Sequence, residues 1–489
     1  MGVSYGDESP IAAFATSPGK NALTLIRCSG KGAIEMAASV FSRPEKLRSA
    51  AGNTVIHGWI IAANEKIDEV LVSVFRAPKS YTGEDSLDIS CHGGSAVGQG
   101  VMSALHAAGF RDALSGEFTF RAFINGKLDL TRSESVMELV SAKTGASRRH
   151  AVNRLSGALE NEINEIKKSL VTVLSGAEIF LDYSEDEVGA NSDETAGRLP
   201  GQAQAAEALG RLKKLAASWQ RERIYQEGVL AVIAGRPNAG KSSLFNLLLR
   251  EDRSIVTEIP GTTRDWIEAW VSIEDIPIRL ADTAGLRESA DLVEKLGVER
   301  SRELLAEAEL VLYLIDGVEG VTEEDRAFFS ELEQADGAAG RPVLLLWNKA
   351  DISPMPASPL IAANENGNNI SIEKTIPISV SAKTGEGMAE LCRAIAAAIE
   401  SVALPVIAGA DLSADVSQNA ALGSARQKNL VEAAIAALEE TLQLADRKEP
   451  LDLIAPLLRE AVNALGEITG EVSTADILEE MFRRFCVGK

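Results

Sequence analysis

The sequence predicts a multidomain protein of mixed α/β and α class, with an N-terminal α+β domain, a helical domain, and an α/β domain inserted into the helical one. Two observations lead to this prediction. The chain has 489 residues, enough for about three domains that each bury a core. Its hydrophobic periodicity also changes along the chain, so that alternating strands and helices are flanked on both sides by purely helical sequence.

The first domain is predicted over residues 1–130, where short apolar runs such as 22–26, 70–75 and 87–91 alternate with glycine-containing turns. The first part of the helical domain follows over 131–227, because apolar residues there recur at helical spacing. Strand-like runs then alternate with helical stretches over 228–400, which is typical of a parallel α/β sheet. The second part of the helical domain, 401–489, is rich in alanine and has few strand formers.

Composition excludes several classes of protein. Hydrophobic residues make up 45% and charged residues 25% of the chain, and no run approaches the roughly 18 apolar residues of a membrane span. No export signal is visible at the N-terminus, so a cytoplasmic location and no membrane partner are expected. The four cysteines form no CxxC pair, which argues for reduced thiols. A net charge of −22 argues against non-specific coating of nucleic acid.

A GxxxxGKS motif at residues 235–242 follows a strand-like run and precedes a helical one. Its glycines let backbone N–H groups turn toward phosphate oxygens. Lys241 is expected to reach the β- and γ-phosphates, and the hydroxyl of Ser242 is expected to ligate Mg²⁺. The motif in this position predicts a phosphate-binding P-loop.

Three further motifs follow in an order that a chance P-loop would not have. Asp282 begins a DTAG sequence, and its carboxylate is placed to hold the Mg²⁺ shell. Asp351 ends an NKAD sequence and can accept hydrogen bonds from the N1–H and amine of guanine, whereas adenine would leave that carboxylate unpaired. A SAK sequence at 381–383 would close over the base. Together the four motifs predict a P-loop GTPase domain of Ras-like fold that hydrolyses GTP to GDP and phosphate.

The residue that positions the attacking water is not fixed by these motifs. Many small GTPases place a glutamine after DTAG, where this chain has Leu286, and all four histidines precede the domain. Glu288 and Glu294 are the nearest carboxylates, and from the residues alone both also fit solvated surface acids. The PGTTRD segment at 260–265 is expected to be a switch loop whose threonine completes the Mg²⁺ shell.

Sequence blocks outside the GTPase motifs resemble the MnmE/TrmE family of tRNA uridine-5-carboxymethylaminomethyl modification GTPases. These blocks are residues 11–19, 25–30, 80–85, 91–94 and 116–130, together with the terminal Cys-Val-Gly-Lys at 486–489. The resemblance spans the whole chain. It implies a GTPase that, with a partner using FAD and NADH, adds an aminomethyl or carboxymethylaminomethyl group to C5 of the wobble uridine of certain tRNAs.

The resemblance also assigns ions and nucleotide contacts. It implies K⁺ beside the phosphates, held by Asn238 with groups from Thr257, Ile259 and Thr262, and Mg²⁺ on Ser242 and Thr263. It favours Glu294 over Glu288 as the residue that positions water, with Lys241 as the other catalytic residue of the domain. The GTP site predicted from the motifs and the resemblance comprises Asn238, Ala239, Gly240, Lys241, Ser242, Ser243, Thr257, Thr262, Thr263, Asp282, Thr283, Ala284, Gly285, Asn348, Lys349, Asp351, Ser381, Ala382 and Lys383.

For the N-terminal domain the resemblance implies a folate-binding fold that forms a homodimer and binds a folate of the 5-formyltetrahydrofolate type. Arg27, Glu84, Lys127 and the terminal Lys489 match the ligand contacts, although alone they fit surface ion pairs. Cys486 matches a cysteine that the family needs for modification, although alone it fits inert packing.

The expected partners are GTP and GDP, tRNA, and a FAD-dependent MnmG-like protein in a heterotetramer. The flavin is expected in that partner, because this chain shows no GxGxxG sequence after a strand. The alternative is a ribosome-assembly GTPase with the same switch motifs, which would carry a basic RNA-binding domain after the GTPase domain. Residues 401–489 instead look helical.

Overall fold

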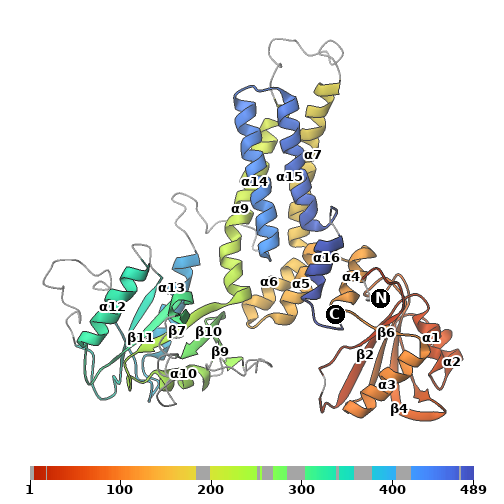
Figure 1. Cartoon of the computed structure of the whole chain (residues 1–489), viewed down its shortest axis with the longest axis horizontal. Coiled ribbons are helices and arrows are strands. Elements are labelled where there is room, and N and C mark those ends of the chain that lie inside the picture. Colours follow the sequence, from red (N-terminus) through yellow and green to blue (C-terminus); the bar gives the residue numbers. More distant parts are fainter. Residues whose placement is uncertain are drawn as a thin grey trace. The chain divides into compact units, whose positions relative to one another are not determined.

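The computed structural model describes residues 5–17, 19–182, 199–250, 254–255, 268–282, 303–336, 341–356, 377–403, 420–472 and 475–488. The chain divides into two compact units. The first unit contains residues 1–137, 155–210 and 429–489, and the second contains 138–154 and 211–428. The predicted fold class is confirmed, with an N-terminal α+β domain, a helical domain and an inserted P-loop GTPase-like domain (Figure 1).

The N-terminal domain is built on a six-stranded sheet in the order β3-β4-β5-β2-β1-β6, in which β6 pairs parallel to β1 and the other pairs are antiparallel. Its strands are β1 (Ile11–Phe14), β2 (Leu23–Ser29), β3 (Thr54–Ala62), β4 (Glu65–Phe75), β5 (Ser86–His92) and β6 (Arg111–Asp112). Its helices are α1 (Ala33–Ser39), α2 (Pro44–Arg48), α3 (Ser95–Ala108) and α4 (Glu117–Ile124).

One face of this sheet carries the core of the domain. Alternate residues of β4, Val70, Val72 and Val74, are buried, as the two-residue period of a strand requires. They pack with apolar residues of α1 and α3, among them Ile34 and Leu105. Helices α1 and α3 therefore cover one side of the sheet, and on the other side Phe118 of α4 packs against Ile11 and Ala13 of β1.

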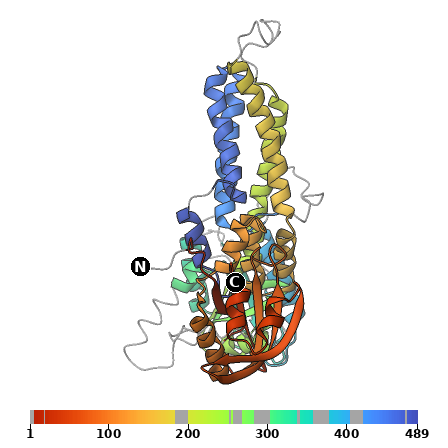
Figure 2. The same cartoon turned by 90° about the vertical axis from the view of Figure 1, so that its right-hand side faces the viewer.

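The helical domain consists of long amphipathic helices. They are α5 (Leu130–Ser141), α6 (Gly145–Leu155), α7 (Ala158–Asp182), α9 (Gln202–Glu227), α14 (Ala425–Asp446), α15 (Leu451–Thr469) and α16 (Ala475–Arg483). In the first unit, α7 and α15 lie side by side (Figures 1 and 2). Ile163, Ile166 and Leu170 of α7 are fully buried, which matches the helical period in the sequence.

No helix in the described ranges has the length and apolar content that crossing a membrane requires.

The second unit contains a seven-stranded sheet in the order β13-β12-β11-β7-β10-β9-β8. The strands β13 to β10 of this order are parallel, and β9 and β8 are antiparallel. Its elements are β7 (Val229–Gly235), α10 (Lys241–Arg250), β8 (Ser254–Ile255), β9 (Glu268–Ile273), β10 (Ile276–Asp282), β11 (Leu310–Asp316), α12 (Glu323–Asp336), β12 (Val343–Asn348), β13 (Ile378–Ser379) and α13 (Met388–Ala403).

Both faces of this sheet are covered, so its central strands are apolar throughout. In β7, Ala231 and Ile233 pack on the side of α10 and α13, while Val232 packs on the side of α12. The parallel strands bring their carboxyl ends to one edge of the sheet. In open α/β sheets this edge is where ligands bind.

A buried ion cluster lies among α5, α6 and α9 of the second unit. Arg154 is 2% exposed and contacts Glu138 at 2.6 Å and Glu222 at 2.7 Å. His150 Nδ1 lies 2.7 Å from the other oxygen of Glu222. Burial alone would raise the pKa of Glu222, but the hydrogen bond from His150 and the charge of Arg154 hold that pKa below its ordinary value. The cluster therefore stabilises the folded state through its ionised form.

Candidate functional site

The P-loop connects β7 to α10 and requires unusual backbone angles. Asn238 has a φ of +64° and Gly240 a φ of +101°. A Cβ on Gly240 would lie 2.2 Å from the Nδ2 atom of Asn348, so only glycine fits there. The Nζ atom of Lys241 donates to the carbonyl oxygens of Gly235 and Arg236, both at 2.8 Å. The lysine is thus held across the loop, as the predicted phosphate-binding role requires.

The predicted Mg²⁺ ligands of the described residues lie in contact. The hydroxyl of Ser242, at the start of α10, donates to Asp282 Oδ2 at 2.8 Å, and Asp282 ends β10 and is 2% exposed. A hydroxyl and a carboxylate oxygen are donors that Mg²⁺ prefers, so the pair fits this ion. No group of three or more His, Cys, Asp or Glu side chains in the described parts of the chain suggests a separate metal centre.

The NKAD sequence at 348–351 is hydrogen-bonded through its side chains to the P-loop and to the SAK sequence at 381–383. Asn348 Nδ2 donates to the carbonyl of Ala239 at 2.6 Å, and its Oδ1 accepts from the N–H of Ala382 at 3.0 Å. Ser381 is fully buried, and its hydroxyl donates to Asp351 Oδ1 at 2.7 Å. The Asp351 carboxylate is exposed and therefore free to meet a base from solvent. The strand ends of β7, β12 and β13 thus meet at one edge of the sheet and bring these motifs together.

Lys349 is held by Asp316, which is not among the predicted site residues. Its ammonium contacts Asp316 Oδ2 at the end of β11. Burial alone would raise the pKa of Asp316, but the hydrogen bond from Lys349 and the one from the Val318 N–H keep that pKa below its ordinary value. Asp316 therefore fixes the lysine of the NKAD sequence. Asp316 stands at the end of the apolar run of β11, and this position at a strand end is the feature of the sequence from which its role could have been predicted.

Other predicted site residues are placed differently. Ser243 lies on the exposed side of α10, and Lys383 is exposed in the loop after β13. The predicted residues outside the described part of the chain are Thr257, Ile259, Thr262, Thr263, Thr283, Ala284, Gly285, Glu288, Glu294 and Lys489. Their proposed roles in the switch loops and at the folate site stay predictions.

Three residues predicted to bind folate lie around one region of the N-terminal domain. Arg27 and Ser29 point from the same face of β2, because they are two residues apart. Arg27 pairs with Asp88 at 3.0 Å, and its guanidinium lies 6.0 Å from the ring centre of Phe118 on α4. Lys127 Nζ donates to the carbonyl of Pro78 at 3.0 Å, in the loop that also carries Glu84.

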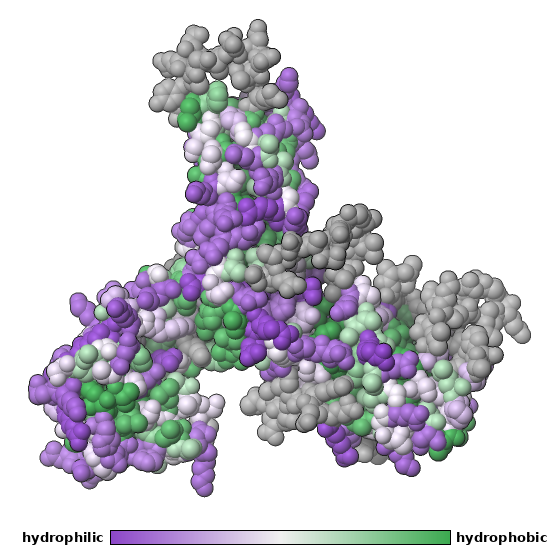
Figure 3. Space-filling view, turned by 180° about the vertical axis from the view of Figure 1, so that it is seen from behind, coloured by the Kyte–Doolittle hydropathy of each residue, from purple (hydrophilic) through white to green (hydrophobic). Residues whose placement is uncertain are grey.

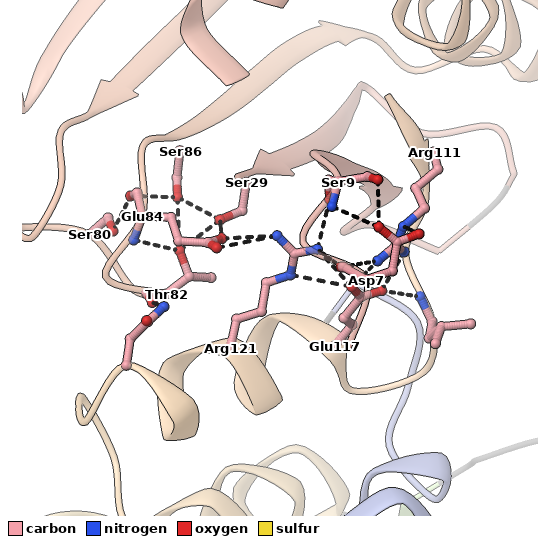
Figure 4. Close-up of polar contacts among 12 residues, drawn as sticks. Asp7, Ser9, Ser29, Ser80, Thr82, Glu84, Ser86, Arg111, Glu117 and Arg121 are labelled. Carbon is pink, nitrogen blue, oxygen red and sulfur yellow. Dashed lines mark hydrogen bonds and ion pairs between the residues drawn. The ribbon is translucent and has the colours of Figure 1, made fainter. Parts of the chain in front are cut away.

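Glu84 is held by donors from two elements. Its Oε2 accepts from the hydroxyl of Ser29 at 2.9 Å and lies 3.1 Å from Arg121 Nη1 (Figure 4). The side chain remains 23% exposed, so a ligand can reach it. A carboxylate that is held in place and partly exposed can pair with the N–H edge of a pterin, while Arg27 and Lys127 supply cations for the carboxylates of a folate. Arg121 and Ser29 were missed as site residues. Arg121 lies in the 116–130 block that resembles the family, but its spacing from Glu117 is equally typical of a surface ion pair on a helix.

The C-terminal tail is seated on the N-terminal domain. Val487 forms a β-bridge with Ser115, and the N–H of Gly116 donates to the carbonyl of Cys486 at 3.3 Å. Phe482 and Phe485 pack with aromatic residues that include Phe120. Of the four cysteines, Cys486 is exposed and the other three are buried. The accessible thiol therefore lies beside the start of α4.

Comparisons with known families and proteins cover almost the whole chain. The description "GTP-binding protein TrmE N-terminus" matches residues 10–127, and "MnmE helical domain" matches residues 130–486. The chain is similar to the tRNA modification GTPase MnmE of Treponema denticola, with 42% identity over 99% of each chain. It is 39% identical to the protein of that name from Carboxydothermus hydrogenoformans, over 99% of this chain and 100% of the relative.

Among solved structures, the chain is similar to Era of Aquifex aeolicus bound to GDP and aluminium fluoride. The identity is 28%, the match covers 43% of this chain and 66% of the other, and the TM-score is 0.27.

Proposed function

The chain belongs to the MnmE family of tRNA modification GTPases, and from this premise we propose the details of its reaction. It is a GTP hydrolase of tRNA modification, and its family uses a guanine nucleotide with Mg²⁺. We propose that it depends on K⁺ and works with a FAD- and NADH-using, MnmG-like partner in a heterotetramer. The pair adds an aminomethyl or carboxymethylaminomethyl group to C5 of the wobble uridine of certain tRNAs.

The observation that supports this proposal best lies in the first unit. Gly116, the residue before α4, donates to the Cys486 carbonyl, and Arg121 of α4 contacts the Glu84 carboxylate. An exposed thiol and a carboxylate suited to a pterin therefore share one rigid support. A one-carbon unit carried by a folate has to meet both the tail and the uridine, so such an arrangement suits a modification reaction better than ribosome assembly.

The experiment compares cells that lack this protein with cells that carry the intact chain or the Cys486→Ser variant. Nucleoside mass spectrometry of total tRNA should show loss of the C5-modified wobble uridine, restored by the intact chain and not by Cys486→Ser. Unchanged uridines, together with accumulating ribosomal RNA precursors on sucrose gradients, would instead support the ribosome-assembly alternative.

Potassium dependence is proposed from the P-loop. Asn238 is exposed at the rim of the loop, and its amide oxygen is a donor that fits an alkali cation. A cation there would add positive charge beside the phosphates, as an arginine finger does in other GTPases. Phosphate release should be much faster in KCl than in NaCl at equal ionic strength, and Asn238→Ala should remove most of the difference. Equal rates of the intact chain in the two salts would refute the dependence.

A homodimer through the N-terminal domain is proposed from the open face of its sheet. Leu23, Val55 and Leu71 are 62%, 62% and 48% exposed, and the pairing of β2 to β5 puts them on the face opposite α1 and α3. Hydrophobic surface is visible on this domain at the lower left of Figure 3. Light scattering should give the mass of two chains, and Leu71→Glu should give one. A monomeric intact chain would contradict the proposal.

A further inference from the structure

A chain of buried charges runs along α4 of the N-terminal domain (Figure 4). Glu117 is 0% exposed and Arg121 is 6% exposed, although charged side chains are rarely this buried unless they are paired. Glu117 accepts from Arg111 on one side and from Arg121 on the other. Arg121 in turn reaches Glu84, which lies 37 residues earlier in the sequence.

Arg121 uses its whole guanidinium. Nε and Nη2 donate to Glu117 Oε1 at 3.2 and 2.9 Å, and Nη2 also donates to the carbonyl oxygens of Asp7 and Ser9. Nη1 lies 3.3 and 3.1 Å from the two carboxylate oxygens of Glu84. Because Nη2 and Nε are fixed by other partners, Nη1 has one direction, and that direction sets the position of the Glu84 carboxylate.

The rest of the Glu84 environment leaves room for a ligand. Ser29 donates to Oε2 at 2.9 Å, and its oxygen lies 2.7 Å from the hydroxyl of Thr82 and 3.1 Å from that of Ser86. Within the described part of the chain, Oε1 accepts a hydrogen bond from Arg121 alone, at 3.3 Å. Each carboxylate oxygen can accept two hydrogen bonds. The carboxylate is therefore oriented from behind and keeps acceptor capacity on its exposed side.

We propose that Arg121 is the positioning residue of the folate-type site, because its guanidinium fixes the Glu84 carboxylate in the direction of the ligand's N–H edge. This inference rests on the proposed function, in which Glu84 contacts a 5-formyltetrahydrofolate-type ligand. Arg121 acts through Glu84 and needs no contact with the ligand itself. Because the Glu84 side chain is already fixed, ligand binding loses less conformational entropy than it would with a mobile glutamate.

The contacts of Arg121 and Arg111 indicate which variants can separate a positioning role of Arg121 from a role in folding. Without Arg121, Glu117 keeps two hydrogen bonds from Arg111 and one from the Leu114 N–H, whereas Glu84 keeps only the Ser29 hydroxyl as a side-chain donor among these contacts. Arg111→Met is a matched control, because Arg111 pairs with Glu117 and with the carboxylate and carbonyl of Asp7, and no described contact joins it to Glu84. Both variants remove one arginine from the same carboxylate, a buried one at Arg121 and a half-buried one at Arg111.

The experiment is isothermal titration of 5-formyltetrahydrofolate into the full-length intact chain and into four variants: Arg121→Met, Arg121→Lys, Arg111→Met and Glu84→Gln. Arg121→Met should weaken binding by roughly 10- to 100-fold, the size expected for a lost charge-assisted contact. Arg121→Lys should recover part of the affinity because it keeps the charge. Arg111→Met should stay within about twofold, since it leaves the Glu84 contacts in place.

A double-mutant cycle completes the test. If Arg121 acts through Glu84, the Arg121→Met, Glu84→Gln double variant should bind about as weakly as the worse single variant. Strictly additive losses, or equal losses in Arg121→Met and Arg111→Met, would overturn the positioning role. If Arg121→Met does not fold, the same cycle with Arg121→Lys gives the answer. Failure of the intact chain to bind the folate would instead refute the proposed function.

Discussion

We expect the guanine specificity of the nucleotide site to depend on one carboxylate, that of Asp351. Guanine offers two N–H donors to it, and the Ser381 hydroxyl holds Oδ1 from the other side at 2.7 Å. Asp351→Asn keeps the shape but replaces one acceptor oxygen with an N–H₂ donor and removes the charge. Two charge-assisted hydrogen bonds at about 1.5–3 kcal/mol each give a loss of about 3–6 kcal/mol, or roughly 10²- to 10⁴-fold in GTP affinity.

The same substitution should change which base is preferred. Xanthine has a carbonyl where guanine has its amine, so the new amide can donate to it, and xanthosine triphosphate should bind the variant better than GTP. Competition against a fluorescent guanine nucleotide measures both affinities. Ser381→Ala is the matched control, because it removes a donor to Asp351 and should weaken GTP binding without exchanging the preference. Unchanged GTP affinity in Asp351→Asn, or an equal loss for both nucleotides, would refute the assignment of Asp351 to the base.

Four further outcomes are expected. Lys241→Ala should abolish phosphate release, because the P-loop loses the ammonium that is held over its first residues, and a steady-state turnover assay checks this. Gly488→Ala should lower tRNA modification and leave GTP turnover intact, because Gly488 has a φ of +90° and a Cβ there would lie 2.4 Å from the backbone oxygen of Phe14. Nucleoside analysis and a phosphate-release assay measure the two effects. Arg154→Met should cost about 3–5 kcal/mol of unfolding free energy in urea, because two carboxylates lose a buried partner. Glu222 has a lowered folded pKa, so its stabilisation should be complete above its ordinary value of 4.5 and lost as pH falls below it, and Glu222→Gln should flatten that part of the urea stability profile.

Much of the fold followed from local patterns. The apolar run before the GxxxxGKS motif became β7, and the period of Ile163, Ile166 and Leu170 became the buried side of α7. Such patterns depend on neighbours within one element, which is why they can be recognised in sequence. The grouping of residues 138–154 with 211–428 in one compact unit could not be recognised in this way, because it depends on contacts between distant helices.

The candidate sites show the same limit. The nucleotide motifs identified the strand ends that meet in the second unit, because each motif has a characteristic sequence and follows a strand. Arg121 was not recognised, since an Arg four residues after a Glu is common on exposed helix faces. Its function depends on the approach of Glu84 from the loop before β5, which only the folded sheet provides. The buried support of a binding residue is therefore the part that sequence reasoning misses.

We propose that GTP hydrolysis by this chain drives modification of the wobble uridine. The test incubates the purified chain with the proposed flavin-dependent partner, FAD, NADH, a one-carbon tetrahydrofolate, an amine source and an unmodified tRNA transcript in KCl, with either GTP or a non-hydrolysable GTP analogue. Mass spectrometry of the nucleosides should show the C5-modified uridine with GTP, and little or none with the analogue or with the Lys241→Ala variant. Equal modification with GTP, with the analogue and without nucleotide would contradict the claim.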